Sequence, residues 1–405
     1  MTALLLRDLA QVATPSAGAG QVARGADLRA VDVIEDAYIL CRGEAVAAVG
    51  RMRDLEPFDG DVEELDCSGL SAVPGLVDCH THPAFGGDRV GEFSLRAGGA
   101  SYEELHAAGG GILSTVTATR ALSPSGLLER VEEHAGWMLA HGTATWEGKS
   151  GYGLDHDTEL ASLRAVRAAG GSPTWLGAHA VPPEHSDADA YLDFILAEVL
   201  PEAARLADAA DVFLERGAFD ATQARRYLEA CAAAGLALRL HGDQFTESGA
   251  VPLSIDLGAR SIDHLEATRA GGVEELSYSD VVAVLLPASA LFLDRPMPPG
   301  RALVDAGAAV ALATDFNPGS SFTTSLPLIA SLACTQLHLA PEEALVAMTV
   351  NAAHVLGLTD RGRIAPGLRA DLTLLGAPDW RYLAYHLGGD VVSAVIRAGA
   401  PAFRR

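Results

Sequence analysis

Two histidines separated by a single residue, His80 and His82, end a run of mostly apolar residues, and Arg89 follows beyond a glycine-rich turn. Residues i and i+2 of a strand point to the same face, so both imidazoles can reach one cation. One H-x-H pair is also found at ordinary polar strand ends. The pair therefore raises the question of which other side chains complete a metal site.

Two more residues of metal-binding type end later apolar runs. His241 lies at the end of ALRLHGD and Asp315 at the end of AVALATD. Three imidazoles and one carboxylate suit zinc or iron(II), and the ligand types do not decide between these metals. We predict a metal site formed by His80, His82, His241 and Asp315.

Two further residues could serve chemistry beside such a metal. His264 ends the run SIDHLE and could orient a water activated by the metal and accept its proton, although a packed core histidine is the alternative. Arg89 could bind a carboxylate through two parallel hydrogen bonds, although an isolated surface arginine is the alternative.

Eight short apolar runs must bring these residues together. The runs are GLVDCHTH, TATWEGKS, TWLGAHAV, DVFLE, ALRLHGD, SIDHLE, VVAVLL and AVALATD. Alanine-rich stretches of helical character alternate with them, which is typical of parallel βα units. We predict an α/β fold, a (β/α)₈ TIM-type barrel with its chemistry at the carboxyl ends of the strands. A doubly wound open sheet is the alternative.

Both ends of the chain are rich in strand patterns. Residues 1–72 include AYILC and AVAAVG on either side of Arg42-Gly43-Glu44, which predicts a hairpin, and residues 358–405 include ADLTLLG and VVSAVIRAG. We predict that the two ends form one small β-sandwich domain beside a metal-binding barrel at 73–357.

Composition excludes several classes of protein. The 405 residues carry a formal net charge of -24, which argues against nucleic-acid and anionic-membrane partners. Five scattered cysteines and no basic leader at the N-terminus predict a cytoplasmic protein with reduced thiols. The run Gly109-Gly110-Gly111 lacks the G-K-[ST] of a phosphate loop, so it more plausibly turns or lets backbone approach the active-site mouth.

The chain resembles the amidohydrolase superfamily, metal-dependent hydrolases with H-x-H on the first barrel strand, histidines on the fifth and sixth, and aspartate on the eighth. The resemblance is carried by PGLVDCHTHPAFGGDR, GGGILSTVTATR, KSGYGLD, LGAHAVPPE and ATDFNPGSSFTTSLPLIASLACTQ. Within the superfamily the chain is most similar to hydrolases of histidine degradation. The resemblance implies ring opening of 4-imidazolone-5-propanoate, a cyclic amide, to N-formimidoyl-L-glutamate.

The resemblance also implies a role for each site residue. His264 would activate or position the hydroxide, and Asp315, besides binding the metal, would pass a proton to the departing nitrogen. The implied substrate-binding residues are Arg89, Tyr152, His179, Gln244, Asn317, Gly319 and Ser320. The fourth strand, DVFLE, lacks the lysine that dinuclear members carboxylate, so one divalent metal per chain, zinc or iron, is expected.

Gln244 departs from the pattern, because many relatives have glutamate in its place. A glutamine can hydrogen-bond the imidazolone ring but cannot act as a base. Gln244 therefore stays among the candidate catalytic and substrate-binding residues, and we expect it to bind the substrate.

Other functions fit parts of the pattern. Another cyclic amidase, or a deaminase of purine or pyrimidine type, would use the same metal, but a neutral base gives no reason for Arg89 and Tyr152 to form a carboxylate clamp. A barrel without catalysis would be expected to lose its metal ligands, and all four are present. A homodimer is compatible with the sequence.

Overall fold

Eight parallel strands form the centre of the larger part of the molecule. In the computed structural model, which describes residues 3–16, 21–57, 61–99 and 111–405, each strand pairs with the next in chain order. They are β6 (Leu76–Asp78), β7 (Thr143–Lys149), β8 (Ser172–Ala178), β9 (Ala209–Leu214), β10 (Ala237–Gly242), β11 (Ser261–His264), β12 (Val282–Leu285) and β13 (Val310–Leu312). Each contains part of one predicted run, so the barrel is confirmed and the open sheet is excluded.

The barrel nearly closes where the first strand meets the last. Thr81 forms a parallel bridge with Phe316, and the His82 amide donates to the Phe316 carbonyl at 2.8 Å. The Asp315 amide donates to the His80 carbonyl at 3.1 Å. Backbone pairing itself therefore brings the H-x-H segment next to Asp315.

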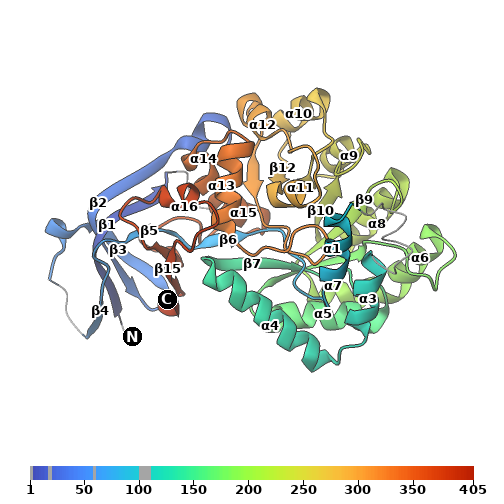
Figure 1. Cartoon of the computed structure of the whole chain (residues 1–405), viewed down its shortest axis with the longest axis horizontal. Coiled ribbons are helices and arrows are strands. Elements are labelled where there is room, and N and C mark those ends of the chain that lie inside the picture. The colour runs from blue at the N-terminus through green and yellow to red at the C-terminus, as the bar shows by residue number, and fades with distance from the viewer. Residues whose placement is uncertain (1–2, 17–20, 58–60, 100–110) are drawn as a thin grey trace.

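Helices cover the outside of the barrel (Figure 1). They are α1 (Val90–Ala97), α3 (Ile112–Arg120), α4 (Pro124–Ala140), α5 (His156–Ala168), α6 (Ala188–Phe194), α7 (Leu200–Leu206), α8 (Ala221–Ala233), α9 (Ala250–Asp256), α10 (Ala270–Ser277), α11 (Pro287–Phe292), α12 (Gly300–Ala306), α13 (Leu326–Gln336), α14 (Pro341–Ala347), α15 (Val350–Val355) and α16 (Tyr382–Tyr385). Two 3₁₀ turns (Gly25–Arg29, Met52–Asp54) and a π-helical turn (Ile195–Val199) are also present among the described residues.

Local sequence explains where several of these helices stop. Helices α5 and α8 are followed by Gly170 and Gly235, whose φ angles of 86° and 90° lie in the left-handed region that glycine adopts without strain. The stretch PEEALVAMTVNAAHVLG (341–357) has helical character along its whole length but forms two helices, α14 and α15, because Thr349 leaves the helical region with φ -129° and ψ -85°.

Strands from both chain ends form the second part of the molecule, which lies at one end of the barrel (Figure 1). They are β1 (Ala3–Pro15), β2 (Val31–Arg42), β3 (Ala45–Arg51), β4 (Val62–Asp66), β5 (Ser71–Pro74), β14 (Leu372–Leu375), β15 (Val392–Arg397) and β16 (Ala400–Arg404). They join into one mixed sheet in the order β16-β15-β14-β5-β1-β2-β3, with β4 on β1. The predicted β unit from both termini is confirmed, including the hairpin at Gly43, whereas its domain boundaries stay a prediction.

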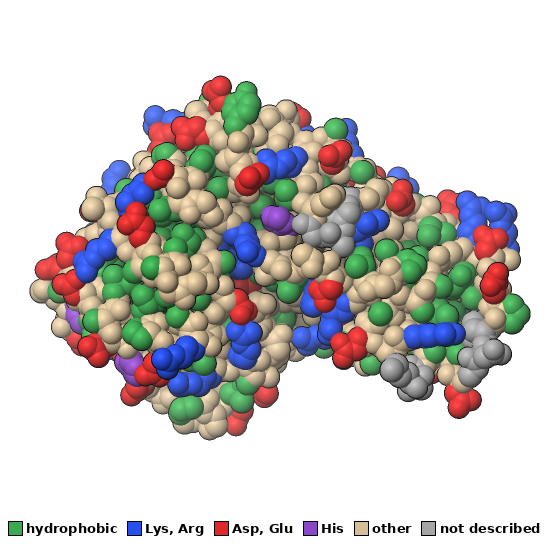
Figure 2. Space-filling model, turned by 180° about the vertical axis from the view of Figure 1, so that it is seen from behind, with side chains coloured by type: hydrophobic (Ala, Val, Ile, Leu, Met, Phe, Trp, Pro, Cys, Tyr) green, Lys and Arg blue, Asp and Glu red, His purple; other side chains and the backbone are tan. Residues whose placement is uncertain are grey.

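The surface shows no concentration of one charge on the face seen in Figure 2, where acidic and basic side chains alternate across the described residues. Among the same residues, no helix is both long and apolar enough to cross a bilayer.

Gly109 and Gly110 of the glycine run lie outside the described residues, and Gly111 precedes α3 with φ 91°.

A buried asparagine fastens the N-terminal segment to the barrel. The Asn351 amide donates to the carbonyls of Ala23 (3.0 Å) and Val310 (2.7 Å), and its oxygen accepts from the Ala23 amide at 2.8 Å. One side chain thus satisfies three buried backbone groups, which are costly to leave unpaired.

Replacing Asn351 by alanine should destabilise the whole protein. The change leaves the backbone groups of Ala23 and Val310 without partners, which we expect to lower the free energy of unfolding by about 2–3 kcal/mol. Urea unfolding followed by circular dichroism measures the loss. Thr117→Ala, which removes an exposed hydrogen bond to Leu113 within α3, is the matched control and should change stability little; an equal effect of both changes would contradict the assigned role.

Candidate active site

Four predicted ligands converge at the carboxyl end of the barrel. The Nε2 atom of His82 lies 3.3 Å from Nε2 of both His80 and His241. The Oδ1 atom of Asp315 lies 3.5 Å from Nε2 of His80 and 3.4 Å from Nε2 of His82. A tetrahedron with zinc–ligand bonds of about 2.0–2.1 Å has edges of about 3.3–3.4 Å, and these four spacings are close to that length. They place Asp315 with His80 and His82 in one possible ligand triad, and His241 with His80 in another.

Two carboxylates hold the far side of the imidazole rings. Asp263 Oδ2 lies 2.6 Å from Nδ1 of His80, and Asp211 Oδ1 lies 3.0 Å from Nδ1 of His241. A carboxylate at Nδ1 keeps the proton on that nitrogen, so the lone pair of Nε2 faces the cluster. The two rings are therefore fixed both in orientation and in tautomer.

One lysine joins these carboxylates beneath the histidines. Lys149 is fully buried, and its Nζ donates to Asp211 at 2.7 Å and to Glu147 at 2.8 Å and lies 3.8 Å from Asp263. Arg239 donates to the same Glu147 at 2.5 Å. Two cations thus face three carboxylates without solvent, and this network supports the cluster from below.

Burial and neighbouring charges set the protonation of this site. Burial, with smaller contributions from Lys149 and His241, lowers the pKa of His80 to about 3. Burial alone would raise the pKa of Asp315, but the adjacent imidazoles of His80, His82 and His264 hold it well below the usual value. Neutral imidazoles and an ionised carboxylate are the forms that bind a divalent metal.

His264 lies at the same mouth in a different environment. Its ring centroid is 5.3 Å from that of His241, and its Nδ1 is 3.3 Å from Oε1 of Glu266. Burial would lower its pKa, but the carboxylates of Glu266, Asp315 and Asp263 outweigh burial and raise it. Its φ of 87° is rare for a residue with a side chain and is typical of functional sites. His264 also groups with His80 and His241 as a second possible ligand triad.

Tyr152 and His179 line the wall beside His82. The ring of His179 stacks on His82 with centroids 5.6 Å apart, and the ring of Tyr152 lies 5.3 Å from that of His179. His179 Nδ1 donates to the Gly151 carbonyl at 2.9 Å, and burial lowers the pKa of this histidine well below its usual value. In the neutral His179 the proton lies on Nδ1, which donates to Gly151. The lone pair of Nε2 therefore takes no part in that hydrogen bond.

The predicted substrate residues of the 317–320 loop lie against Asp315, although two of them are occupied within the loop. Asn317 donates to the Asp315 carbonyl and to Ser320 Oγ, both at 2.7 Å, and accepts from the amides of Gly319 and Ser320. Ser320 Oγ lies 3.1 Å from Oδ2 of Asp315. Their contacts indicate that Asn317 and Ser320 shape the loop and orient the carboxylate.

The structure does not bring every predicted residue into the cluster. Gln244 is buried three residues beyond His241, yet no hydrogen bond within the described ranges connects its amide to the four ligands. Arg89 lies against the 317–320 loop, since a Cβ added to Gly319 would come within 2.1 Å of its Nη1. Its guanidinium is held by Glu92, an interaction that the sequence did not suggest.

Sequence reasoning missed the supporting layer below the metal ligands. All five residues lie within the predicted strand runs, and none is among the predicted site residues: Glu147, Lys149, Asp211, Arg239 and Asp263. A signal was present, because charged residues inside otherwise apolar strands are rarely buried unless they are paired. Residues two apart, such as Glu147 and Lys149, share one face and were candidates for such pairing.

Known proteins resemble this chain along its whole length. A family model described as "Amidohydrolase family" matches residues 100–403. The imidazolonepropionase of Rubrobacter xylanophilus is 59% identical over 98% of this chain and 98% of its own length. That of Deinococcus radiodurans is 44% identical over 99% of this chain and 100% of its own length.

Solved structures of lower sequence identity share the fold. An adenosine deaminase from Xanthomonas campestris with bound zinc superposes with a TM-score of 0.72 at 18% identity, covering 99% of this chain and 93% of its own. The N-isopropylammelide isopropylaminohydrolase of Burkholderia multivorans gives a TM-score of 0.69 at 22% identity, covering 100% and 99%. The buried His/Asp cluster is consistent with a metal site in a fold whose members include zinc-bound proteins.

Replacing Asp263 by asparagine should weaken metal binding. The neutral amide removes the charge that fixes the proton of His80, and loss of such support typically costs about ten- to a hundredfold in affinity. Competition with a chromophoric chelator measures the affinity for zinc. Asp208→Asn, an exposed aspartate paired with Arg167, is the control; equal affinities for all three proteins would contradict the role of Asp263.

The metal-free protein should lose stability as the pH falls. The folded state keeps His80 neutral down to about pH 3, whereas the unfolded chain protonates it near its usual pKa of 6.5. The unfolded state thus binds more protons below about pH 6.5, and stability decreases down to about pH 3. At about pH 5 this histidine accounts for about 2 kcal/mol, which urea unfolding of chelator-treated protein measures. His80→Asn should reduce the pH dependence, and an unchanged dependence would contradict the assignment.

Proposed function

The chain belongs to the imidazolonepropionases of the amidohydrolase family, and we propose how its residues divide the opening of the 4-imidazolone-5-propanoate ring. The reaction adds the elements of water across the amide bond between the ring carbonyl carbon and a ring nitrogen. It leaves N-formimidoyl-L-glutamate. One observation supports this assignment of roles most strongly. Three imidazole nitrogens and one carboxylate oxygen lie close together, and each is within 3.5 Å of at least one of the others.

One divalent metal per chain, zinc or iron, would be held by His80, His82, His241 and Asp315. When bound, it would supply Lewis acidity, polarising the ring carbonyl and lowering the pKa of water. The edge lengths of the ligand cluster and the neutral state of its histidines support this assignment.

His264 and Asp315 handle the protons in this proposal. His264, oriented by Glu266, accepts the proton of the attacking water and hydrogen-bonds the oxygen that develops negative charge. Asp315, with its other oxygen fixed by Ser320, then passes this same proton on to the departing ring nitrogen as the C–N bond breaks. Gln244 cannot take a proton, so its contribution is hydrogen bonding to the ring.

Arg89, Tyr152 and His179 bind the substrate. The guanidinium of Arg89 binds the propanoate beside Gly319, and Tyr152 and His179 form the polar aromatic wall against which the planar ring lies.

The five cysteines are free and four of them are buried, which supports a cytoplasmic location.

The metal-loaded protein should convert 4-imidazolone-5-propanoate, seen as loss of its ultraviolet absorbance. Arg89→Met should raise KM by about tenfold or more, since a charge-assisted hydrogen bond to the propanoate is lost, while the metal content per chain stays constant. Metal content is measured by atomic absorption in the same preparations.

Two results would contradict these assignments. Deamination of a purine or pyrimidine, with no turnover of 4-imidazolone-5-propanoate, would show that the pocket serves another substrate class. Loss of metal from Arg89→Met in proportion to its loss of activity would show that Arg89 supports the metal cluster and not the substrate.

A further inference from the structure

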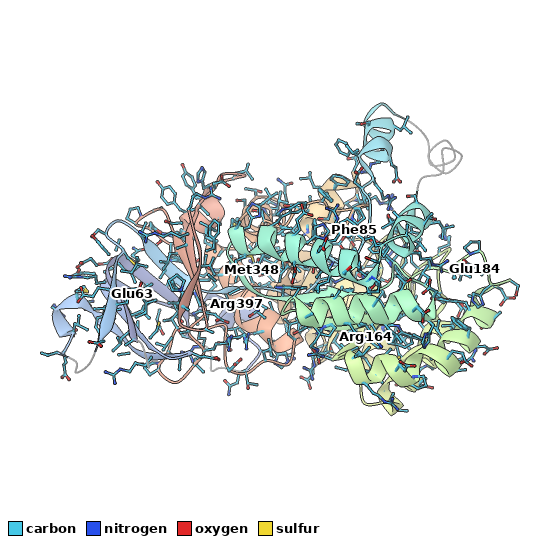
Figure 3. The ribbon with its side chains drawn as sticks, turned by 90° about the horizontal axis from the view of Figure 1, so that it is seen from below. Glu63, Phe85, Arg164, Glu184, Met348 and Arg397 are labelled. Carbon is cyan, nitrogen blue, oxygen red and sulfur yellow. The ribbon has the colours of Figure 1, made fainter. Side chains whose placement is uncertain are left out.

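Helix α1 turns its charged residues inward and its apolar residues outward. Arg89 and Glu92 have side chains only 15% and 12% exposed, whereas Val90 and Phe93 are 66% and 47% exposed. A surface helix normally shows the reverse pattern. Figure 3 shows α1, the pale blue helix, projecting from the barrel. Phe93 stacks on Phe292 of α11 with ring centroids 5.3 Å apart but stays 47% exposed, so this contact buries only part of the apolar side.

Glu92 occupies one edge of the Arg89 guanidinium. Its Oε2 accepts from Nε at 2.9 Å and its Oε1 from Nη2 at 2.5 Å. The same Oε2 accepts the amide of Gly111 at 2.8 Å, which fixes the carboxylate on its other side. A guanidinium has a second edge, between its two Nη atoms, that can also bind a carboxylate in bidentate fashion.

The second edge of Arg89 lies at the 317–320 loop. A Cβ on Gly319 would approach Nη1 to 2.1 Å, so the absence of a side chain there is what allows the guanidinium to reach the loop. Arg96, two turns further along α1, extends Nη1 to 3.5 Å from the Gly319 carbonyl and packs over the Phe292 ring at 4.7 Å. Of the charged side chains described on this face, Arg89 and Arg96 are positive and Glu92 is negative, so these three carry a net positive charge.

We propose that Glu92 is a positioning residue for carboxylate recognition. It fixes the plane of Arg89 so that the Nη1 edge, beside Gly319, receives the propanoate of the substrate. This inference rests on the proposed function and adds a residue that determines specificity for an anionic substrate. The net positive charge of the helix face means that Glu92 orients the arginine without cancelling its attraction for a carboxylate.

The test compares Glu92→Gln with the wild type on 4-imidazolone-5-propanoate and on its neutral propanamide analogue. The variant should raise KM for the carboxylate about tenfold or more, keep kcat within about twofold, and leave KM for the amide unchanged. Gly319→Ala, which displaces Nη1, should give the same selective increase. Glu133→Gln is the matched control, because Glu133 pairs with Arg130 at the same i,i+3 spacing on the surface of α4.

Calorimetric binding of both compounds, measured in parallel, separates this inference from the proposed function. If the wild type binds the carboxylate but does not hydrolyse it, the proposed function fails while weaker binding by Glu92→Gln still supports the role of Glu92. Unchanged binding and KM in Glu92→Gln would overturn the inference. Tighter binding of the carboxylate would show that Glu92 screens Arg89, and equal losses for carboxylate and amide would show a purely structural role; both results also overturn it.

Discussion

Charge balance in a dry barrel interior is the constraint on which the rest of the site depends. Three carboxylates, Glu147, Asp211 and Asp263, lie fully buried with Lys149 and Arg239. Burial would raise the pKa of Asp211, but His241 and Lys149 hold it well below its usual value. An unpaired charge at this depth is strongly unfavourable, so each member requires the others. The histidines above take their orientation from this network.

The sequence predicted the fold and the close approach of the four candidate ligands for a specific physical reason. Parallel barrel strands place their carboxyl ends together, so polar residues that end apolar runs, such as His241 and Asp315, are brought close by topology alone. Strand period then decides that His80 and His82 share a face. Both arguments need only local pattern and element order.

The remaining contacts could not be predicted because they depend on three-dimensional register. Which carboxylate reaches which imidazole is decided by the pairing of β9, β10 and β11, where His241 lies opposite Asp263 on the neighbouring strand but hydrogen-bonds Asp211. The ion pair between Arg89 and Glu92 depends on a short helix, α1, whose exposed side is apolar. From the sequence alone, the apolar side of such a helix is expected to face the core and its charged side to face solvent. The break at Thr349 likewise has no proline or glycine to announce it.

The closure between the first and last barrel strands has a consequence for how the protein matures. Asp78 on β6 accepts hydrogen bonds from Thr314, 236 residues later, directly below the ligand cluster. No fragment shorter than the barrel contains the full set of ligands, and the cluster exists only once the eighth strand has docked on the first. A metal bound by these four residues would therefore be acquired only after nearly the whole chain has been synthesised.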